Sequence, residues 1–235
     1  MDRDFDGEPN YDWKQALYYF DWILAKWLKE AGKLKDFYMV YSVGKNFRHD
    51  LYPDYKANRK DIERHPCFDG LKAEVIDRMD AIFEEGIEAD DLIGIRCSEF
   101  PEKTLAISAD KDFATIPCNL MIPSSHGRKH ADWHHFTEDE ANLNWLRQAM
   151  TGDTIDNYKG IPRVGIVGAT KVIPDIAPLD QLWAATEAAF IQKNLTPEYA
   201  LTMARVARIL RHGDYDFETK KVTLWEPKAK LSKKS

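Results

Sequence analysis

The chain has 235 residues, with 33 Lys and Arg against 39 Asp and Glu, so its formal net charge is −6. Hydrophobic residues make up 44% and charged residues 31% of the sequence, which is typical of a globular protein and excludes wholesale disorder. No apolar run approaches the roughly 18 residues of a membrane span, and the acidic start at residues 1–6 lacks the apolar stretch of a secretory signal.

The three cysteines, Cys67, Cys97 and Cys118, are odd in number and form no CxxC pair. This pattern indicates reduced thiols, so we expect a cytoplasmic protein without a membrane partner.

Charge is segregated along the chain. Residues 84–91 carry five acids and no base, whereas residues 157–171 carry three bases and no acid. Separate acidic and basic zones suit a metal-binding cleft beside an anion-binding surface.

Apolar residues at spacings of three and four predict a long amphipathic helix over 11–29, which ends at Gly32. A short strand is predicted at 37–41. Residues 44–64 are rich in basic residues, Pro and Asn without a clear period, which predicts a long arch or loop.

The rest of the chain alternates in an α/β pattern. Helices are predicted over 71–83, 92–100, 137–150, 179–192 and 197–211, and strands at 104–108, 120–122 and 222–225. Four glycines and Pro162 exclude a continuous helix over 152–168, and residues 228–235 form a basic tail.

The first chemical constellation is Glu88, Asp90 and Asp91, at the start of a predicted helix. Acids at this position commonly cap a helix, but capping needs one acid or two. Three carboxylates so close repel one another unless a cation holds them, which favours a divalent metal site.

The second constellation is Asp110 and Asp112, directly after a predicted buried strand. Strand ends in an open α/β sheet are where ligands bind, although by itself this pair is better explained as an ordinary Asp-Lys-Asp turn.

The third constellation starts with Asp153 and Asp156 and continues through residues 160–171. The sequence Gly-Ile-Pro-Arg-Val-Gly turns the chain tightly and presents backbone N–H groups at a helix start, which suits a DNA phosphate. The alternative is a helix hairpin that only packs.

The fourth constellation comprises residues 46–49 and 52–60. Lys56 and Arg59 share a face if this piece is helical, and Tyr52 and Tyr55 are suited to stacking on bases. A solvated charged loop is the more common explanation for such a segment alone.

Together and in this order, the four constellations resemble the 5′-nuclease superfamily of 5′–3′ exonucleases and flap endonucleases. The resemblance covers about residues 35–175, and the tail from Met203 to Pro227 is most similar to the small exonucleases of short-tailed bacteriophages. It implies metal-dependent 5′–3′ hydrolysis of duplex DNA with 5′ ends, and of RNA–DNA hybrids, in phage DNA replication or degradation, without a small-molecule cofactor.

The resemblance implies an α/β fold with a mostly parallel central sheet flanked by helices, a PIN-like nuclease core. This core would span 1–135 and include the basic arch 44–64. A helical DNA-binding region would span 136–235, with a helix–turn–helix at 152–175.

The resemblance also implies the site residues. Two Mg²⁺ or Mn²⁺ ions would be held by Glu88, Asp90, Asp91, Asp110, Asp112, Asp153 and Asp156. The catalytic residues would be Lys56, Arg59 and Asp110. DNA would contact Arg48, Tyr55, Lys56, Arg59, Lys159, Gly160, Arg163, Gly165, Gly168 and Lys171, with a potassium ion at 160–171.

The chain departs from the family pattern in two places. Family members begin with an apolar strand that ends in a metal-binding aspartate, and Met1 lies after the point where that strand belongs. Residues 40–44, after the strand at 37–41, carry no acid where the family has a second aspartate. The alternative interpretation is therefore an N-terminally truncated, catalytically impaired protein that binds DNA by its structure.

A phosphatase and a zinc protein are weaker interpretations of the same sequence. A haloacid-dehalogenase-type phosphatase also places DxD after a strand, but Thr115 lies one position late and the pattern leaves Gly-Ile-Pro-Arg-Val-Gly unexplained. A zinc site from Cys118, His126, His130 and His134 would need the last two histidines on one helical face, and its spacing matches no standard cluster.

Overall fold

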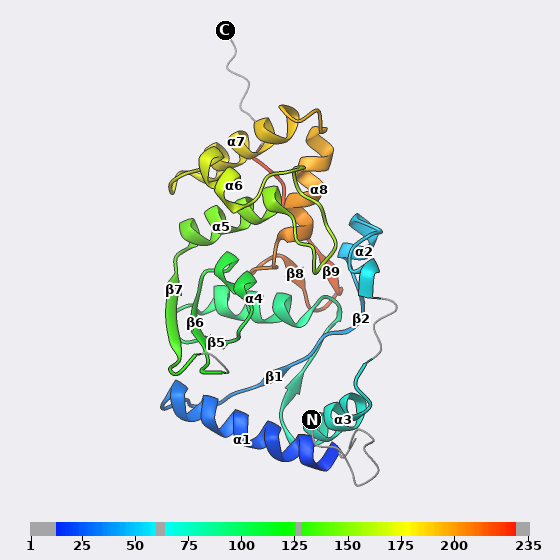
Figure 1. The fold of residues 1–235 in the computed structure, drawn as a ribbon, viewed down its shortest axis with the longest axis vertical. Helices are drawn as coiled ribbons and strands as arrows, with labels where there is room; N and C mark the ends of the chain where they lie inside the picture. Colours follow the sequence, from blue (N-terminus) through cyan, green and yellow to red (C-terminus); the bar gives the residue numbers. More distant parts are fainter. Residues whose placement is uncertain (1–12, 60–63, 126–127, 229–235) are drawn as a thin grey trace.

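The computed structural model describes residues 13–59, 64–125 and 128–228, and it confirms the α/β class (Figure 1). Helices α5 to α8 gather at one end of the molecule, α1 and α3 lie at the other, and the strands and α4 lie between them. The boundary expected at residue 135 falls within the last residues of β7 (Asp132–Phe136), just before α5, and stays a prediction.

The described helices differ greatly in length. They are α1 (Trp13–Ala31), α2 (Arg48–Leu51), α3 (Cys67–Arg78), α4 (Ala89–Glu99), α5 (Glu138–Thr151), α6 (Ile166–Val172), α7 (Leu179–Ile191) and α8 (Pro197–Ala207), with 3-10 segments at Ala57–Arg59 (η1) and Lys111–Thr115 (η2).

The strands are short. They are β1 (Met39–Val40), β2 (Val43–Asn46), β3 (Ala81–Ile82), β4 (Glu85–Gly86), β5 (Leu105–Ile107), β6 (Cys118–Ile122), β7 (Asp132–Phe136), β8 (Tyr215–Asp216) and β9 (Lys221–Val222). Three pairings are parallel, β1–β3, β2–β4 and β5–β6, and two are antiparallel, β6–β7 and β8–β9. Pairing is thus mostly parallel, but in the described chain it is divided among four small sheets.

The predicted amphipathic helix is present as α1, and Gly32 follows it with a φ of +81°. Helix α1 packs on α3, but none of its residues is fully buried. Its apolar face is therefore only partly covered by the described residues.

In the first half of the chain, tertiary contacts overrode local sequence preference in two predicted elements. The supposed loop at 44–64 contains β2, which pairs with β4, and α2, which packs on α8. The helix predicted over 71–83 ends at Arg78, and Ala81–Ile82 instead forms β3 beside β1.

The helix predicted over 197–211 ends early, at Ala207. From Arg208 the backbone becomes extended, and its polar groups bond to side chains from elsewhere in the chain. The Arg208 carbonyl accepts from Arg48 at 2.7 Å, and the Leu210 N–H donates to Asp91 at 3.0 Å. These buried side chains satisfy the backbone in place of helical bonds.

The helical end has its own apolar core. Trp145, Phe190 and Met203 are fully buried there, and the Trp145 indole N–H donates to the Ala204 carbonyl at 2.7 Å. Trp225, from the chain's tail, packs edge-on against Trp145. This core makes the α5–α8 end a rigid support for the loops that it carries.

The turn between α5 and α6 depends on two glycines in the left-handed region, Gly152 (φ +69°) and Gly160 (φ +56°). The backbone folds back on itself, because Asp153 and Tyr158 exchange two backbone hydrogen bonds of 2.9 and 3.0 Å. A Cβ on Gly160 would lie 2.4 Å from the Gly152 nitrogen. Only glycine fits where the backbone at Gly160 passes so close to Gly152, and the turn between them carries Asp153 and Asp156.

We expect Gly160→Ala to lower the free energy of unfolding by about 2 kcal/mol or more, because of the clash and the positive φ. Chemical denaturation measures the change. Gly165→Ala is the matched control, because its φ is −93° and nothing lies near its Cβ position, so its effect should stay within about 0.5 kcal/mol. Equal stability of the two variants would contradict the tight crossing.

Candidate functional site

A buried ion pair between Arg48 of α2 and Asp91 of α4 lies at the base of the site. The guanidinium donates twice to the Asp91 carboxylate, at 2.6 Å each, and the two residues are 3% and 0% exposed. Arg48 also donates to the Val206 and Arg208 carbonyls at 2.9 and 2.7 Å. One side chain thus joins α2, α4 and the end of α8.

The oxygens of Asp91 are fully engaged. One accepts from Arg48 and the Leu210 N–H, and the other from Arg48 and the Glu88 N–H, as part of the capping box that starts α4. No lone pair is left for a cation. The structure therefore brings Asp91 to the site as a structural anchor, and it places Arg48, expected near DNA, away from any surface.

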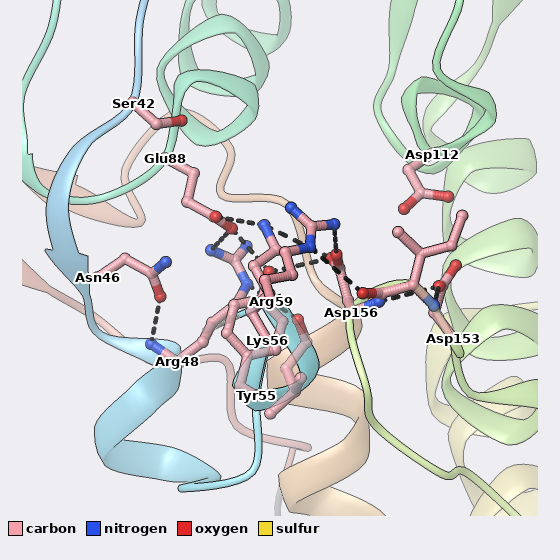
Figure 2. A network of polar contacts seen from close by, with 12 residues as sticks. Ser42, Asn46, Arg48, Tyr55, Lys56, Arg59, Glu88, Asp112, Asp153 and Asp156 are labelled. Atoms are coloured by element: carbon pink, nitrogen blue, oxygen red, sulfur yellow. Dashed lines mark hydrogen bonds and ion pairs between the residues drawn. The ribbon is translucent and has the colours of Figure 1, made fainter. Parts of the chain in front are cut away.

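A second network of polar contacts connects the arch to Glu88, next to α4, and to Asp156, in the turn between α5 and α6 (Figure 2). The buried Tyr55 hydroxyl donates to Glu88 at 2.7 Å and to Asp156 at 3.1 Å. Lys56 forms ion pairs with the same two carboxylates. Although burial raises the pKa of Glu88, the charges of Arg48 and Lys56 outweigh it and hold this pKa below its ordinary value.

The arch segment is docked on the turn that carries Asp156. The Lys56 N–H donates to the Asp156 carbonyl at 2.9 Å, with Lys56 itself at a φ of +54°. Arg59 pairs with the Asp156 carboxylate at 2.6 Å, and Asn157 donates to the Asp54 carbonyl at 2.7 Å. Lys56 and Arg59 therefore lie beside the acids, and their expected role toward a phosphate stays a prediction, whereas Tyr55 is too buried to stack on a base.

Negative charge is in excess around Asp90, Asp110 and Asp112. Burial and the neighbouring carboxylates, Asp110 first among them, raise the pKa of Asp90 to about 7. Burial and Asp110 likewise raise the pKa of Asp112 to about 6. Asp110 itself is exposed and caps η2, where it accepts from the Asp112 N–H at 2.9 Å.

The negative charge of the Asp153 carboxylate is offset by three hydrogen-bond donors. One oxygen accepts from the Ile155 and Asp156 N–H groups at 2.7 and 3.2 Å, and the other accepts from Lys111 at 3.1 Å. Burial raises the pKa of Asp153, but the Lys111 hydrogen bond and the two backbone donors outweigh this effect and lower it.

The acids are near one another without forming a ready-made metal centre: among the described residues, no three of His, Cys, Asp or Glu are gathered closely enough to hold an ion. Their chemistry nevertheless fits one. Carboxylate oxygens suit Mg²⁺ or Mn²⁺, and a cation would offset both the burial and the neighbouring carboxylates that raise the pKa values of Asp90 and Asp112.

The predicted DNA-binding residues of the helical end divide into two groups. Lys159, Arg163 and Lys171 are exposed and form no ion pair within the described residues. Gly160 is buried, whereas Gly165 is exposed as the residue that starts α6. Gly168 packs against Val164.

Three residues of the site were not assigned a role from the sequence. Ser42 stands in the acid-free segment 40–44, and its hydroxyl accepts from the Ala89 N–H at 2.9 Å, between Glu88 and Asp90. Lys111 neutralises Asp153, and Asn46 accepts from the Arg48 N–H at 2.9 Å. Of these three, only Lys111 could have been recognised from the sequence, because it lies between two acids.

The zinc interpretation relied on a helical face that does not exist, since His134 lies on strand β7 and His130 precedes that strand. Cys118 is fully buried, and His126 lies outside the described residues. The phosphatase interpretation needed Thr115 at the site, but this side chain is buried and donates to the Asp112 backbone carbonyl at 2.7 Å.

Residues 8–140 match the family described as "5'-3' exonuclease, N-terminal resolvase-like domain". Among curated proteins, the exonuclease of Escherichia phage T7 is 27% identical over 229 residues, covering 80% of this chain and 73% of that protein. DNA polymerase I of Chloroflexus aurantiacus is 30% identical over 206 residues, covering 80% of this chain but 21% of the polymerase.

Solved structures share the fold. A bacteriophage T5 protein co-crystallised with metal ions aligns with a TM-score of 0.62 at 18% identity, covering 82% of this chain and 80% of that one. A T5 flap endonuclease in complex with DNA and metal ions aligns with a TM-score of 0.55 at 18% identity, covering 82% and 84%. Within the described residues, no helix combines the length and apolarity needed to cross a membrane.

We expect Arg48→Met to lower the free energy of unfolding by about 3–5 kcal/mol, because it leaves the Asp91 carboxylate buried and unpaired. Denaturant unfolding measures the loss. Adding Asp91→Asn should recover part of it by removing the buried charge. Arg78→Met, which breaks a half-exposed pair with Asp21, should cost less than about 1 kcal/mol. Similar losses for Arg48→Met and Arg78→Met would contradict the anchoring role.

We expect Asp90→Asn to stabilise the metal-free protein increasingly between pH 4 and 7. The folded pKa of Asp90, about 7, lies above its ordinary value of 3.8, so the stability present at low pH is lost as pH rises and the carboxyl ionises. At pH 8 the variant should gain up to about 4 kcal/mol, and at pH 4 almost nothing.

Denaturant unfolding in chelator at pH 4, 6 and 8 measures this difference. Asp175→Asn, at an exposed position, is the control and should show no pH-dependent gain. A gain for Asp90→Asn that is the same at every pH would rule out the proposed charge repulsion.

Proposed function

Because the chain belongs to the 5′–3′ exonuclease family, we propose that it hydrolyses phosphodiester bonds of duplex DNA from 5′ ends, with Mg²⁺ or Mn²⁺ as cofactor. RNA–DNA hybrids are a further proposed substrate. The T7 relative is named an exonuclease, and the T5 flap endonuclease was solved with DNA and metal ions, which supports this proposal.

One observation carries the proposal: Asp90, whose pKa is raised by burial and by neighbouring carboxylates, lies near Lys56 of the arch, and Asp110 adjoins both Asp90 and Asp112. Lys56 interacts with Asp90 as well as pairing with Glu88. Acids that need a cation, next to bases that suit a phosphate, form a site complementary to a metal-bound phosphodiester.

The cations would be held by Glu88, Asp90, Asp110 and Asp112 on one side and by Asp153 and Asp156 on the other. When bound, such ions supply a water of lowered pKa and neutralise charge on the phosphate and the leaving oxygen. Asp110 is the best placed ligand, because it is exposed and adjoins both acids with raised pKa values.

Lys56 and Arg59 would stabilise the negative charge that develops on the phosphate. Arg59 is the more accessible, since its side chain is 42% exposed against 18% for Lys56. A guanidinium also matches two phosphate oxygens at once. Both side chains would exchange a carboxylate partner for the phosphate.

The duplex would be gripped at the helical end. Lys159, Arg163 and Lys171 project from the turn and α6, where the first helical N–H groups lack helical partners and suit a phosphate. The potassium ion at 160–171 belongs to the same proposal. Contacts to the DNA backbone carry no sequence information, so the proposed selection is by DNA structure.

The second candidate is a DNA-binding protein without catalysis. Ser42 favours it, because the position nearest the α4 acids in segment 40–44 holds a hydroxyl where the family pattern places a carboxylate. Digestion of 5′-end-labelled duplex DNA with and without Mg²⁺ separates the two candidates, since both bind DNA and only the nuclease releases labelled products.

We expect Asp110→Asn to lower the cleavage rate at least about 10²-fold, because a central cation ligand is lost, while duplex binding in chelator stays near the wild-type value. Labelled-duplex digestion measures the rate, and a gel-shift titration measures binding. Asp175→Asn is the control and should cleave like the wild type. Cleavage by Asp110→Asn at the wild-type rate would refute its role.

A further inference from the structure

Lys111 is a cation placed among the acids of the site. It is the first residue of η2 and lies in the sequence between Asp110 and Asp112. Its ammonium donates to Oδ2 of Asp153 at 3.1 Å, across 42 residues of sequence. Because Asp153 belongs to the turn between α5 and α6, this ion pair joins the acids of η2 to the acids of that turn.

The two ends of the pair differ in their freedom to move. Asp153 is fixed, since its side chain is 6% exposed and its backbone exchanges two hydrogen bonds with Tyr158. The Lys111 side chain is 74% exposed, on a flexible four-carbon stem, and it donates to no other side chain of the described residues. When this pair rearranges, Lys111 therefore moves and Asp153 stays.

The two oxygens of Asp153 differ in what they can offer a metal ion. Oδ1 accepts from the Ile155 and Asp156 N–H groups at 2.7 and 3.2 Å, which uses both of its lone pairs. Within the described chain, Oδ2 accepts from Lys111 alone. A cation that Asp153 holds must therefore use Oδ2, the oxygen that the ammonium occupies.

A divalent cation and the Lys111 ammonium compete for this oxygen, because two positive charges repel one another at such short range. The hydrogen bond to Asp153, aided by the charges of Asp153, Asp112 and Asp110, outweighs burial and raises the pKa of Lys111, so the ammonium stays charged at neutral pH. An exposed lysine–aspartate pair is weak, and a divalent ion with several carboxylate ligands can displace it.

We propose that Lys111 is an internal counter-cation, whose ammonium occupies Oδ2 of Asp153 in the metal-free protein and leaves that oxygen when a divalent cation binds there. This inference rests on the proposed metal site. Lys111 then connects η2 to the turn in the absence of metal, and it sets the metal concentration at which Asp153 takes up a cation.

The test is Mn²⁺ binding by Lys111→Met without DNA, with free Mn²⁺ measured by electron paramagnetic resonance. Removing the competitor should tighten Mn²⁺ binding about three- to fivefold, since the wild-type oxygen is open only while the ammonium is away. A lysine that merely held the acids in position would give the opposite sign, because its loss would misplace the ligands. Unchanged or weaker Mn²⁺ binding by Lys111→Met would overturn the inference.

Lys220→Met is the matched control for charge. Lys220 pairs with Glu84 at 2.9 Å, its side chain is also largely exposed, and neither residue is a proposed ligand, so Mn²⁺ affinity should stay close to the wild-type value. Lys111→Arg keeps a cation in place and should bind Mn²⁺ like the wild type. Equal gains in Lys220→Met and Lys111→Met would make net charge the cause and would also overturn the inference.

Asp153→Asn localises the competition and separates the inference from the proposed function. In this background Lys111→Met should leave Mn²⁺ affinity unchanged, because the charged oxygen for which the two cations compete is gone. The same gain in both backgrounds would overturn the inference and leave the proposed metal site intact. If the wild type binds no Mn²⁺, the proposed function fails, and the role of Lys111 fails with it.

Discussion

The buried ion pair between Arg48 and Asp91 is the interaction on which the site depends. It joins the start of the arch, the acidic helix α4 and the backbone after α8, which are far apart in the sequence. A guanidinium without solvent must have its donors satisfied, and the carbonyls of Val206 and Arg208 supply the acceptors that Asp91 cannot. The helix α8 ends where those carbonyls are needed.

Charge compensation divides the acids of the site into two kinds. Asp91, Glu88, Asp153 and Asp156 have basic partners within the protein, whereas Asp90, Asp110 and Asp112 repel one another with little compensation. In the proposed function the second kind would hold the cation, and the first kind holds Lys56 and Arg59 in place beside it.

Most of the chemistry-bearing segments could be predicted from local patterns. The acids at 88–91, 110–112 and 153–156 follow recognisable helix starts, strand ends and turns, and the family that they indicated was confirmed. Their individual roles were less accessible. Asp91 and Asp90 are adjacent and chemically identical, yet one is fully paired in the interior and the other is not, because partners more than 40 residues away decide which carboxylate is neutralised.

Local sequence was enough to establish the α/β class, the amphipathic helix that became α1, and the glycine-dependent turn at 152–160. These features depend on residues within a few positions of one another, so short segments of the sequence are enough to determine them. Only the tertiary structure decided that 44–64 holds a strand and a helix, that α8 stops at Ala207, and that Asp91 is buried against Arg48. Each of these depends on long-range partners that satisfy buried polar groups, and no local pattern encodes which partners will meet.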